Sequence, residues 1–490
     1  MRWVLMALGQ EDFGLCGVVG SVALFMSFIN IQFSKALGRF YAYSIGQANV
    51  ARDYSFALEE CRRWFATGVI IHTIIPIVLI FIGYPIGCWA ITSGIIGIPE
   101  IRREACLWLW RYSCVSSFFA MVNAPFQAMY VAKQYIAELT IYTTAQVILR
   151  TAFIYYMTLQ PGDWLVRYGF AMCLFSIIPE IIICVRACFV FPECRLQLGY
   201  FRLFSYMRQI ANYATWQAIN GIGYLISTHF LAVIVNRFFG PKITASYSIG
   251  YTVSVETTLL NSALEGAFSP AITTAWGEGN LPRVRSFVYQ TCKIGTLLTL
   301  LFAIPAALEI HEVLRIWLKD VPLYAEGFCL FMLIKVVLDR LSAGFVIGVN
   351  ASGRIARYQT INGLILILTA PFALFAVIIF RHVYVVMCVM LTTACLANLV
   401  NVWLARPILG ISLRYWLIRI IIPLALVSIA TSCAGSMVRF WFPPSFIRIV
   451  LTTLVTIGVL FTTAWFFVLT AEEKCYVQLR LNRLLMNKGI

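Results

Sequence analysis

The chain has 490 residues, of which 61% are hydrophobic and 12% are charged. A soluble domain is usually about 45–50% apolar and about 25% charged, so this composition excludes an ordinary soluble protein and predicts a polytopic membrane protein. The net charge of +16 would suggest nucleic acid as a partner of a soluble chain. In a membrane protein, Lys and Arg first set the orientation of the loops, and no nucleic acid is expected as a partner.

The predicted elements are membrane-spanning helices, each needing about 20 apolar residues to cross about 30 Å of hydrocarbon. No sizeable soluble domain fits between them, and about thirteen spans are expected. In chain order they lie near residues 13–37, 64–92, 107–131, 135–159, 164–190, 211–237, 243–271, 286–310, 325–350, 357–380, 383–406, 414–440 and 445–470.

The basic loop residues predict the orientation. About 20 of them fall on one side of the spans and about 12 on the other, which predicts that the loop after the first span lies in the cytoplasm. Met1 is then expected outside and the C-terminal tail inside. Arg354, Arg357 and Arg406 belong to the cytoplasmic set, and topology alone is the simplest interpretation of such loop charges.

Cysteine and histidine offer little material for a metal or catalytic centre. The 15 cysteines are scattered singly and there are only four histidines. Cys184 and Cys188 share a helical face, but Cys in apolar runs is mostly a small apolar residue. No metal is expected, and the chain has no nucleotide-binding phosphate loop that would let it hydrolyse ATP. We therefore do not expect an enzyme.

One loop motif occurs twice. The segment "GQANVARDYSF" at 46–56 returns as "GEGNLPRVRSF" at 277–287, and a shift of 231 residues also matches Gly9 with Gly240 and Cys61 with Cys292. A shift of 219 continues the match through later helices. The chain is thus predicted to be a parallel repeat of two halves, which usually pack around a central cleft.

The repeat predicts four parts of the chain. They are an N-terminal lobe at 1–190, a basic cytoplasmic linker at 191–210, a C-terminal lobe at 211–407, and an extra helix pair with a cytoplasmic tail at 408–490.

The repeated segments resemble a known superfamily. The stretches "LGQEDFGLCGVVGSVALFMSFINIQFSKALGRFYAYSIGQAN", "NRFFGPKITASYSIGYTVSV" and "LEGAFSPAITTAWGEGN" look like the multidrug/oligosaccharidyl-lipid/polysaccharide (MOP) exporter superfamily, closest to its Wzx-type O-antigen and polysaccharide flippases. The resemblance implies an all-α polytopic membrane protein of two pseudo-symmetric lobes. Members follow a fourteen-helix plan, of which this chain is expected to lack the first helix.

The resemblance also implies a function. It suggests that the chain moves undecaprenyl-pyrophosphate-linked oligosaccharides from the inner to the outer leaflet of the bacterial inner membrane by alternating access. The product would serve O-antigen, lipopolysaccharide or other surface polysaccharide synthesis. The expected partners are the bilayer, the lipid-linked sugar and a polysaccharide polymerase.

Five basic residues fall within predicted spans: Lys35, Arg39, Arg150, Lys335 and Arg340. A charge facing lipid is costly, so these side chains are expected to face inward, where Arg suits bidentate contacts with a pyrophosphate. The other interpretation is structural ion pairing between helices. Lys335 and Asp339 share one helical face and are predicted to pair, with Arg340 turned away from them.

Titratable groups within the spans raise the question of energy coupling. Glu180, Glu256, Glu265 and His229 are candidates to bind and release H⁺ or Na⁺ during transport. Charge balance within a cleft is the alternative role for each carboxylate. No other cofactor is expected.

Two further hypotheses stay open. A cation-coupled multidrug or small-solute exporter of the same superfamily would need an acidic binding site in each lobe. A membrane-embedded glycosyltransferase or polymerase would need a sizeable periplasmic loop with catalytic acids, and the short connections argue against it.

Overall fold

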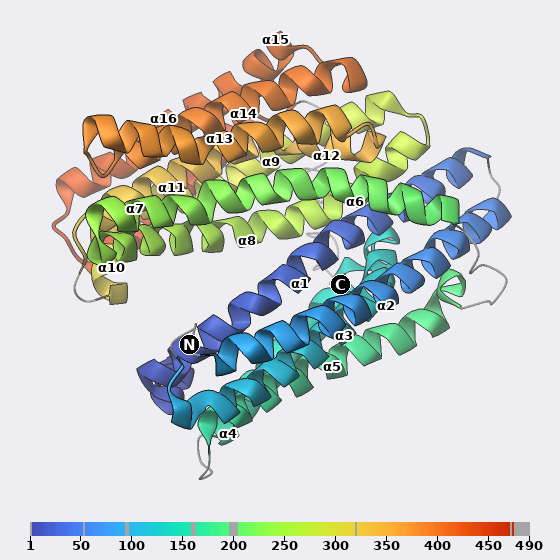
Figure 1. Ribbon diagram of the computed structural model, residues 1–490. Helices are drawn as coiled ribbons and strands as arrows, with labels where there is room; N and C mark the ends of the chain where they lie inside the picture. The colour runs from blue at the N-terminus through green and yellow to red at the C-terminus, as the bar shows by residue number, and fades with distance from the viewer. Residues whose placement is uncertain are drawn as a thin grey trace, which may run out of the picture. The chain divides into compact units, whose positions relative to one another are not determined.

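The computed structural model describes residues 2–51, 54–93, 98–157, 163–195, 204–318, 321–470 and 473–474. Throughout these ranges the chain forms helices and their connections and no strand, which confirms the predicted all-α class (Figure 1). The helices in chain order are α1 (Arg2–Ala51), α2 (Tyr54–Thr92), α3 (Arg103–Ala132), α4 (Ile136–Met157), α5 (Trp164–Val190), α6 (Phe204–Leu225), α7 (Leu231–Phe239), α8 (Pro241–Gly277), α9 (Leu281–Leu308), α10 (Ile310–Leu318), α11 (Ala325–Arg340), α12 (Ala343–Ser352), α13 (Ala356–Phe380), α14 (Val385–Leu409), α15 (Leu413–Trp416), α16 (Ile422–Trp441) and α17 (Phe446–Phe467).

Nine stretches of helix are long and apolar enough to cross a membrane, counting only residues that the structure describes. The π-helical turn Ile226–Phe230 joins α6 to α7, and a second one at Leu417–Ile421 joins α15 to α16. Four further predicted spans coincide with α1, α4, α8 and the pair α11 and α12. These four are helical but fall outside the nine, so the count of about thirteen spans stays a prediction.

The chain divides into two compact units, and the first comprises Met1–Ala218 together with Thr273–Gly279. In this unit α1, α2, α3 and α5 pack against one another and α4 packs on α5. Small residues allow the close approach: a Cβ on Gly87 of α2 would lie 2.4 Å from the ring of Trp110 of α3. The buried indole also donates a hydrogen bond to the Tyr84 carbonyl oxygen at 3.3 Å. The unit is therefore a tightly packed bundle.

The C-terminal end of α8 crosses α1 within this unit through two equivalent glycines. A Cβ on Gly46 would lie 2.1 Å from the Thr274 carbonyl oxygen, and a Cβ on Gly277 would lie 2.4 Å from the Tyr43 carbonyl oxygen. The shift of 231 residues found in the sequence relates Gly46 to Gly277 and Tyr43 to Thr274. The contact is thus reciprocal, and it explains why both copies of the repeated motif begin with glycine.

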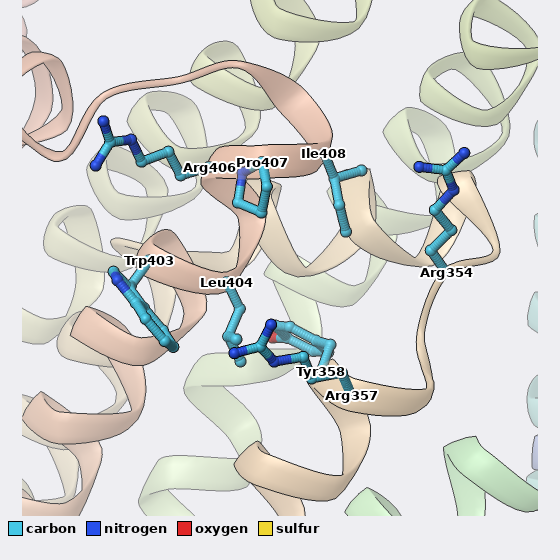
Figure 2. Close-up of a pocket in the computed structure, with 8 residues that line it drawn as sticks. All are labelled: Arg354, Arg357, Tyr358, Trp403, Leu404, Arg406, Pro407 and Ile408. Atoms are coloured by element: carbon cyan, nitrogen blue, oxygen red, sulfur yellow. The ribbon is translucent and has the colours of Figure 1, made fainter.

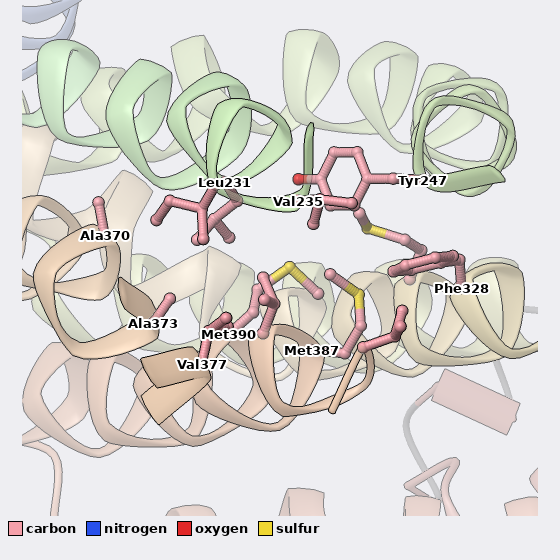
Figure 3. Close-up of a cluster of buried hydrophobic side chains, with 13 residues drawn as sticks. Leu231, Val235, Tyr247, Phe328, Ala370, Ala373, Val377, Met387 and Met390 are labelled. Atoms are coloured by element: carbon pink, nitrogen blue, oxygen red, sulfur yellow. The ribbon is translucent and has the colours of Figure 1, made fainter. Parts of the chain in front are cut away.

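The second unit comprises Ile219–Ile272 and Asn280–Ile490. Its main core joins α7, α8, α11, α13 and α14, as Figure 3 shows. Leu231 and Val235 pack there against Met387 and Met390, and Met side chains adapt readily to irregular spaces. The core residues are Leu231, Ile234, Val235, Tyr247, Phe328, Met332, Ala370, Ala373, Val377, Val383, Val386, Met387 and Met390.

The pair α16 and α17 packs on α9, and a buried charge cluster holds it there. Arg448 of α17 donates to Glu309 at the end of α9, with Nη2 to Oε2 at 2.7 Å. The hydroxyl of Thr452 donates to the other oxygen of this carboxylate at 3.0 Å. Both charged side chains are buried, so the extra C-terminal pair is attached to the second unit by a satisfied ion pair.

The four parts predicted from the sequence are not the same division as these two units, and they stay a prediction. Residues 196–203 of the predicted linker and 475–490 of the predicted cytoplasmic tail lie outside the described residues. The orientation of the chain in the membrane also stays a prediction from the basic residues.

Candidate functional site

The first candidate, Arg39 of α1, lies among aromatic rings. Its guanidinium carbon is 4.9 Å from the centre of the Phe40 ring, 5.5 Å from Tyr43 and 5.3 Å from Tyr213. Phe40 in turn stacks on Trp64, with centroids 4.1 Å apart. Cation–π contacts each contribute about 0.5–2 kcal/mol. These rings position the guanidinium group while it keeps its positive charge.

Arg150 of α4 has a different environment from that of Arg39. It is half-buried, and no described residue forms an ion pair or hydrogen bond with its side chain. Lys35 of α1 lies four residues before Arg39 and is exposed. The first unit therefore holds three predicted basic candidates, and the described chain supplies no carboxylate for Arg150.

Glu180 of α5 faces two amides of α3. Asn123 and Gln127, one helical turn apart, both donate to Oε2 of Glu180, the second at 2.9 Å. Asn123 is buried, and Pro179 lies within the uninterrupted helix beside Glu180. Two amides satisfy a carboxylate without a cation, so this group can gain or lose a proton, or admit a small cation, without breaking an ion pair. Neither amide was predicted from the sequence, because Asn and Gln in apolar runs carry no charge that marks them as a site.

In the second unit the charged candidates are mostly paired. The predicted local pair of Lys335 and Asp339 is confirmed, with Nζ 2.6 Å from Oδ2. Arg340 forms an ion pair with Glu265 of α8, so a predicted cation and a predicted acid neutralise one another. This pairing matches the structural interpretation of both residues more closely than an ion-coupling or substrate-binding one.

Glu256 and His229 are the remaining candidates. Both are exposed, and the Glu256 carboxylate has no partner among the described residues. His229 lies in the π-helical turn between α6 and α7, with its ring 5.7 Å from that of Tyr251. Such turns are frequent at functional sites because they shift side chains out of the regular helical pattern.

The nine candidates are divided between the two units. Lys35, Arg39, Arg150 and Glu180 lie in the first unit, and the other five lie in the second. Across the described ranges no group of three His, Cys, Asp or Glu side chains is placed to hold a metal ion. The basic side chains among them can bind an anion, and the carboxylates and His229 can bind and release a proton or a small cation.

Comparisons of sequence and structure define the fold. No family model and no curated protein matches the sequence. A multidrug resistance MATE family transporter of the MOP superfamily, in an outward-facing conformation, matches the structure with a TM-score of 0.68 and 15% identity, over 84% of this chain and 90% of that one. A MATE protein in a straight conformation gives 0.67 and 17%, over the same 84% and 90%.

A third similar structure is a transporter whose binding pocket differs in polarity. A MOP superfamily transporter from Pyrococcus furiosus, described as having a binding pocket of reverse polarity that suggests a different function, gives a TM-score of 0.63 and 15% identity over 83% of this chain and 93% of that one. The chain thus has the two-lobed fold of MATE transporters of the MOP superfamily, a multi-pass membrane fold. The predicted all-α membrane fold of two lobes is therefore confirmed.

Proposed function

We propose that the chain is a flippase that moves an oligosaccharide carried on undecaprenyl pyrophosphate from the cytoplasmic to the outer leaflet of the bacterial inner membrane. The observation that carries the proposal is Arg150, a half-buried cation in a helix of the first unit with no carboxylate beside it among the described residues. A cation in such a position attracts an anion from outside the chain. A pyrophosphate group supplies that anion.

The physical need of the substrate agrees with this arrangement. The lipid tail stays in the bilayer, whereas the pyrophosphate must cross a region where an unpaired charge costs several kcal/mol. Arginine offers several donors in a planar fork and lowers that cost better than lysine. Arg39, held by its aromatic neighbours, is the second arginine proposed to meet the substrate in the first unit.

The neighbours of known structure support a transporter and leave its substrate open. Two of them carry the name MATE, and the reverse pocket polarity of the Pyrococcus furiosus transporter is taken to suggest a different function for that protein. Pocket polarity therefore varies on this fold. The sequence motifs quoted above, together with Arg150, favour an anionic lipid-linked substrate here.

A cation-coupled multidrug exporter is the second candidate function. Glu180 with its two amides and the unpartnered Glu256 favour it, because one acidic group would then lie in each unit. These same groups also suit H⁺ or Na⁺ coupling in the flippase. The neighbours of known structure are transporters, so they do not favour a glycosyltransferase or polymerase.

The test compares lipid-linked sugar pools in a strain lacking the gene, complemented with the wild type, Arg150→Gln or Arg150→Lys. We expect the deletion and Arg150→Gln to accumulate undecaprenyl-pyrophosphate-linked repeat units and lose surface polysaccharide, with Arg150→Lys intermediate. Arg381→Gln, an exposed arginine at the end of α13, is the matched control and should complement fully.

Protein levels in the membrane must be equal in all strains. Unchanged lipid-linked pools in the deletion strain, together with loss of efflux of cationic dyes, would replace the flippase with the multidrug exporter. Full complementation by Arg150→Gln in a strain that does accumulate the lipid would remove Arg150 from the substrate path.

A further inference from the structure

A cavity of about 390 Å³ lies in the second unit between the beginning of α13 and the last turns of α14. α13 and α14 are both candidate spans. The cavity lies where the N-terminal end of α13 meets the C-terminal end of α14. It is therefore at the level where the hydrocarbon of a membrane gives way to water. The lining residues are Arg354, Arg357, Tyr358, Trp403, Leu404, Arg406, Pro407 and Ile408 (Figure 2).

The floor of this pocket is a fixed part of the fold. The buried Tyr358 hydroxyl donates to Oδ1 of Asn401 at 2.7 Å, and the Asn401 amide donates to the Ser342 hydroxyl at 3.0 Å. These bonds connect α13, α14 and the start of α12 beneath the pocket. A buried, satisfied polar network of this kind holds its members in one arrangement.

The rim carries concentrated positive charge. Arg354 comes from the connection between α12 and α13, Arg357 from the first turn of α13, and Arg406 from α14, and all three line the pocket (Figure 2). Arg357 lies 5.7 Å from the centre of the Trp403 ring. None of the three forms an ion pair with a described residue.

The surrounding sequence cannot neutralise these charges. From residue 341 to residue 471 the chain contains eight arginines and no aspartate, glutamate or lysine. A membrane protein can orient its loops with either lysine or arginine. The exclusive use of arginine, with its planar fork of donors, fits recognition of phosphate in addition to orientation.

The pocket is also partly apolar. Trp403 is 55% exposed, and Leu404, Pro407 and Ile408 contribute further apolar surface. A free inorganic ion would leave this surface in water. A ligand with a phosphate head and an apolar chain would cover it, and Trp is common at the level of lipid head groups.

We propose that this pocket binds the phosphate-bearing head of an anionic membrane lipid, with Arg357 and Arg406 contacting the phosphate and Trp403 the start of the apolar chain. The distribution of basic residues predicts that this end of the unit faces the cytoplasm. None of the nine candidate residues within the spans lines this pocket. Two lipids share this chemistry: a glycerophospholipid such as phosphatidylglycerol, and the polyprenyl pyrophosphate carrier.

The experiment uses the full chain purified in neutral detergent, offered equal amounts of phosphatidylglycerol and phosphatidylcholine, with bound lipid counted by native mass spectrometry. We expect the wild type to retain phosphatidylglycerol preferentially. The double variant Arg357→Gln/Arg406→Gln should lower that preference about tenfold, since each arginine near a phosphate contributes substantially to anionic lipid binding.

The matched control is Arg381→Gln/Arg439→Gln, which removes two exposed arginines that do not line the pocket. Arg381 lies at the C-terminal end of α13, and Arg439 lies in the last turn of α16. It should keep the wild-type preference. Trp403→Ala should weaken retention of phosphatidylglycerol without changing the charge. Equal retention of both lipids by the wild type, or equal losses in the two double variants, would overturn the proposal.

Two competitors identify the source of the ligand. Displacement of phosphatidylglycerol by undecaprenyl pyrophosphate, lost in Arg357→Gln/Arg406→Gln, would assign the pocket to the polyprenyl carrier; failure to displace would assign it to the glycerophospholipid. Displacement by inorganic phosphate at the same concentration as the lipid would show that the apolar half contributes nothing, and would contradict the lipid proposal.

Discussion

Three arginines in helices of this chain illustrate how the neighbours of a charge decide what it can do. Arg340 is neutralised by Glu265, Arg39 is surrounded by aromatic rings, and Arg150 has no carboxylate partner among the described residues. The Arg340–Glu265 pair is partly buried, so substitution of Arg340 also leaves the Glu265 carboxylate without its cation and reports on stability as well as on any substrate contact. Substitution of Arg150 reports on the anion that we propose it binds, because no described carboxylate loses a partner.

Glu180 yields a second prediction at the level of single residues. Glu180→Gln keeps a group that can accept hydrogen bonds from Asn123 and Gln127, yet it cannot exchange a proton. If the carboxylate couples transport to an ion gradient, the variant should lose gradient-driven transport by about tenfold or more while exchange without a gradient persists.

The measurement is transport by reconstituted protein with and without an imposed H⁺ or Na⁺ gradient. Glu256→Gln is the comparison, since it removes the other ion-coupling candidate that has no ion pair with a described residue. Full gradient-driven transport by Glu180→Gln would leave Glu180 with a structural role.

At the level of helices, the crossing of α1 and the end of α8 depends on the absence of two side chains. Gly46→Ala or Gly277→Ala would place a methyl group 2.1 Å or 2.4 Å from a backbone carbonyl oxygen. Such overpacking forces the helices apart and typically costs about 1–3 kcal/mol. We expect each variant to unfold at a lower temperature than the wild type.

Two other glycines on the same helices provide the controls. A Cβ on Gly38 of α1 or on Gly266 of α8 meets nothing within 4 Å. Because alanine is favoured over glycine in a helix by about 1 kcal/mol, Gly38→Ala and Gly266→Ala should be neutral or stabilising. Thermal unfolding in one detergent compares all four variants, and equal effects at the four positions would refute the close-contact argument.

The attachment of α17 gives the second prediction for an element. Arg448→Ala leaves the buried Glu309 carboxylate without its cation, and removing one partner of such a pair costs about 3–5 kcal/mol. The double variant Glu309→Leu/Arg448→Met removes both charges and should recover most of that loss. Thermal unfolding again provides the measurement, and a double variant as unstable as Arg448→Ala would show that the pair itself is not the cause.

For the molecule as a whole, the sequence predicted the class and the repeat more completely than the site. Hydrophobic runs long enough to span a bilayer and the motif written at 46–56 and 277–287 are local in sequence, so the all-α class and the duplication could be found without coordinates. The pair of Lys335 and Asp339 was predictable for the same reason, because helical geometry places residues four apart on one face.

The contacts that cross between distant segments were not predictable. Arg340 meets Glu265 from 75 residues away, and Arg448 meets Glu309 from 139 residues away. The three arginines of the pocket were interpreted as topology alone, since a loop charge gives no sign of a cavity beside it. Which helices pack together is decided by side-chain shape over the entire unit, and one sequence does not reveal it.

The glycine crossing of α1 and α8 has a consequence for the origin of the chain. Residue 46 meets residue 274 and residue 277 meets residue 43, so each repeat presents to the other the same surface that it receives. Two identical molecules related by a two-fold axis make contacts of this self-complementary kind. A single half, before duplication, would already have carried both sides of the contact, and joining two copies into one gene would have required no new interface at this point.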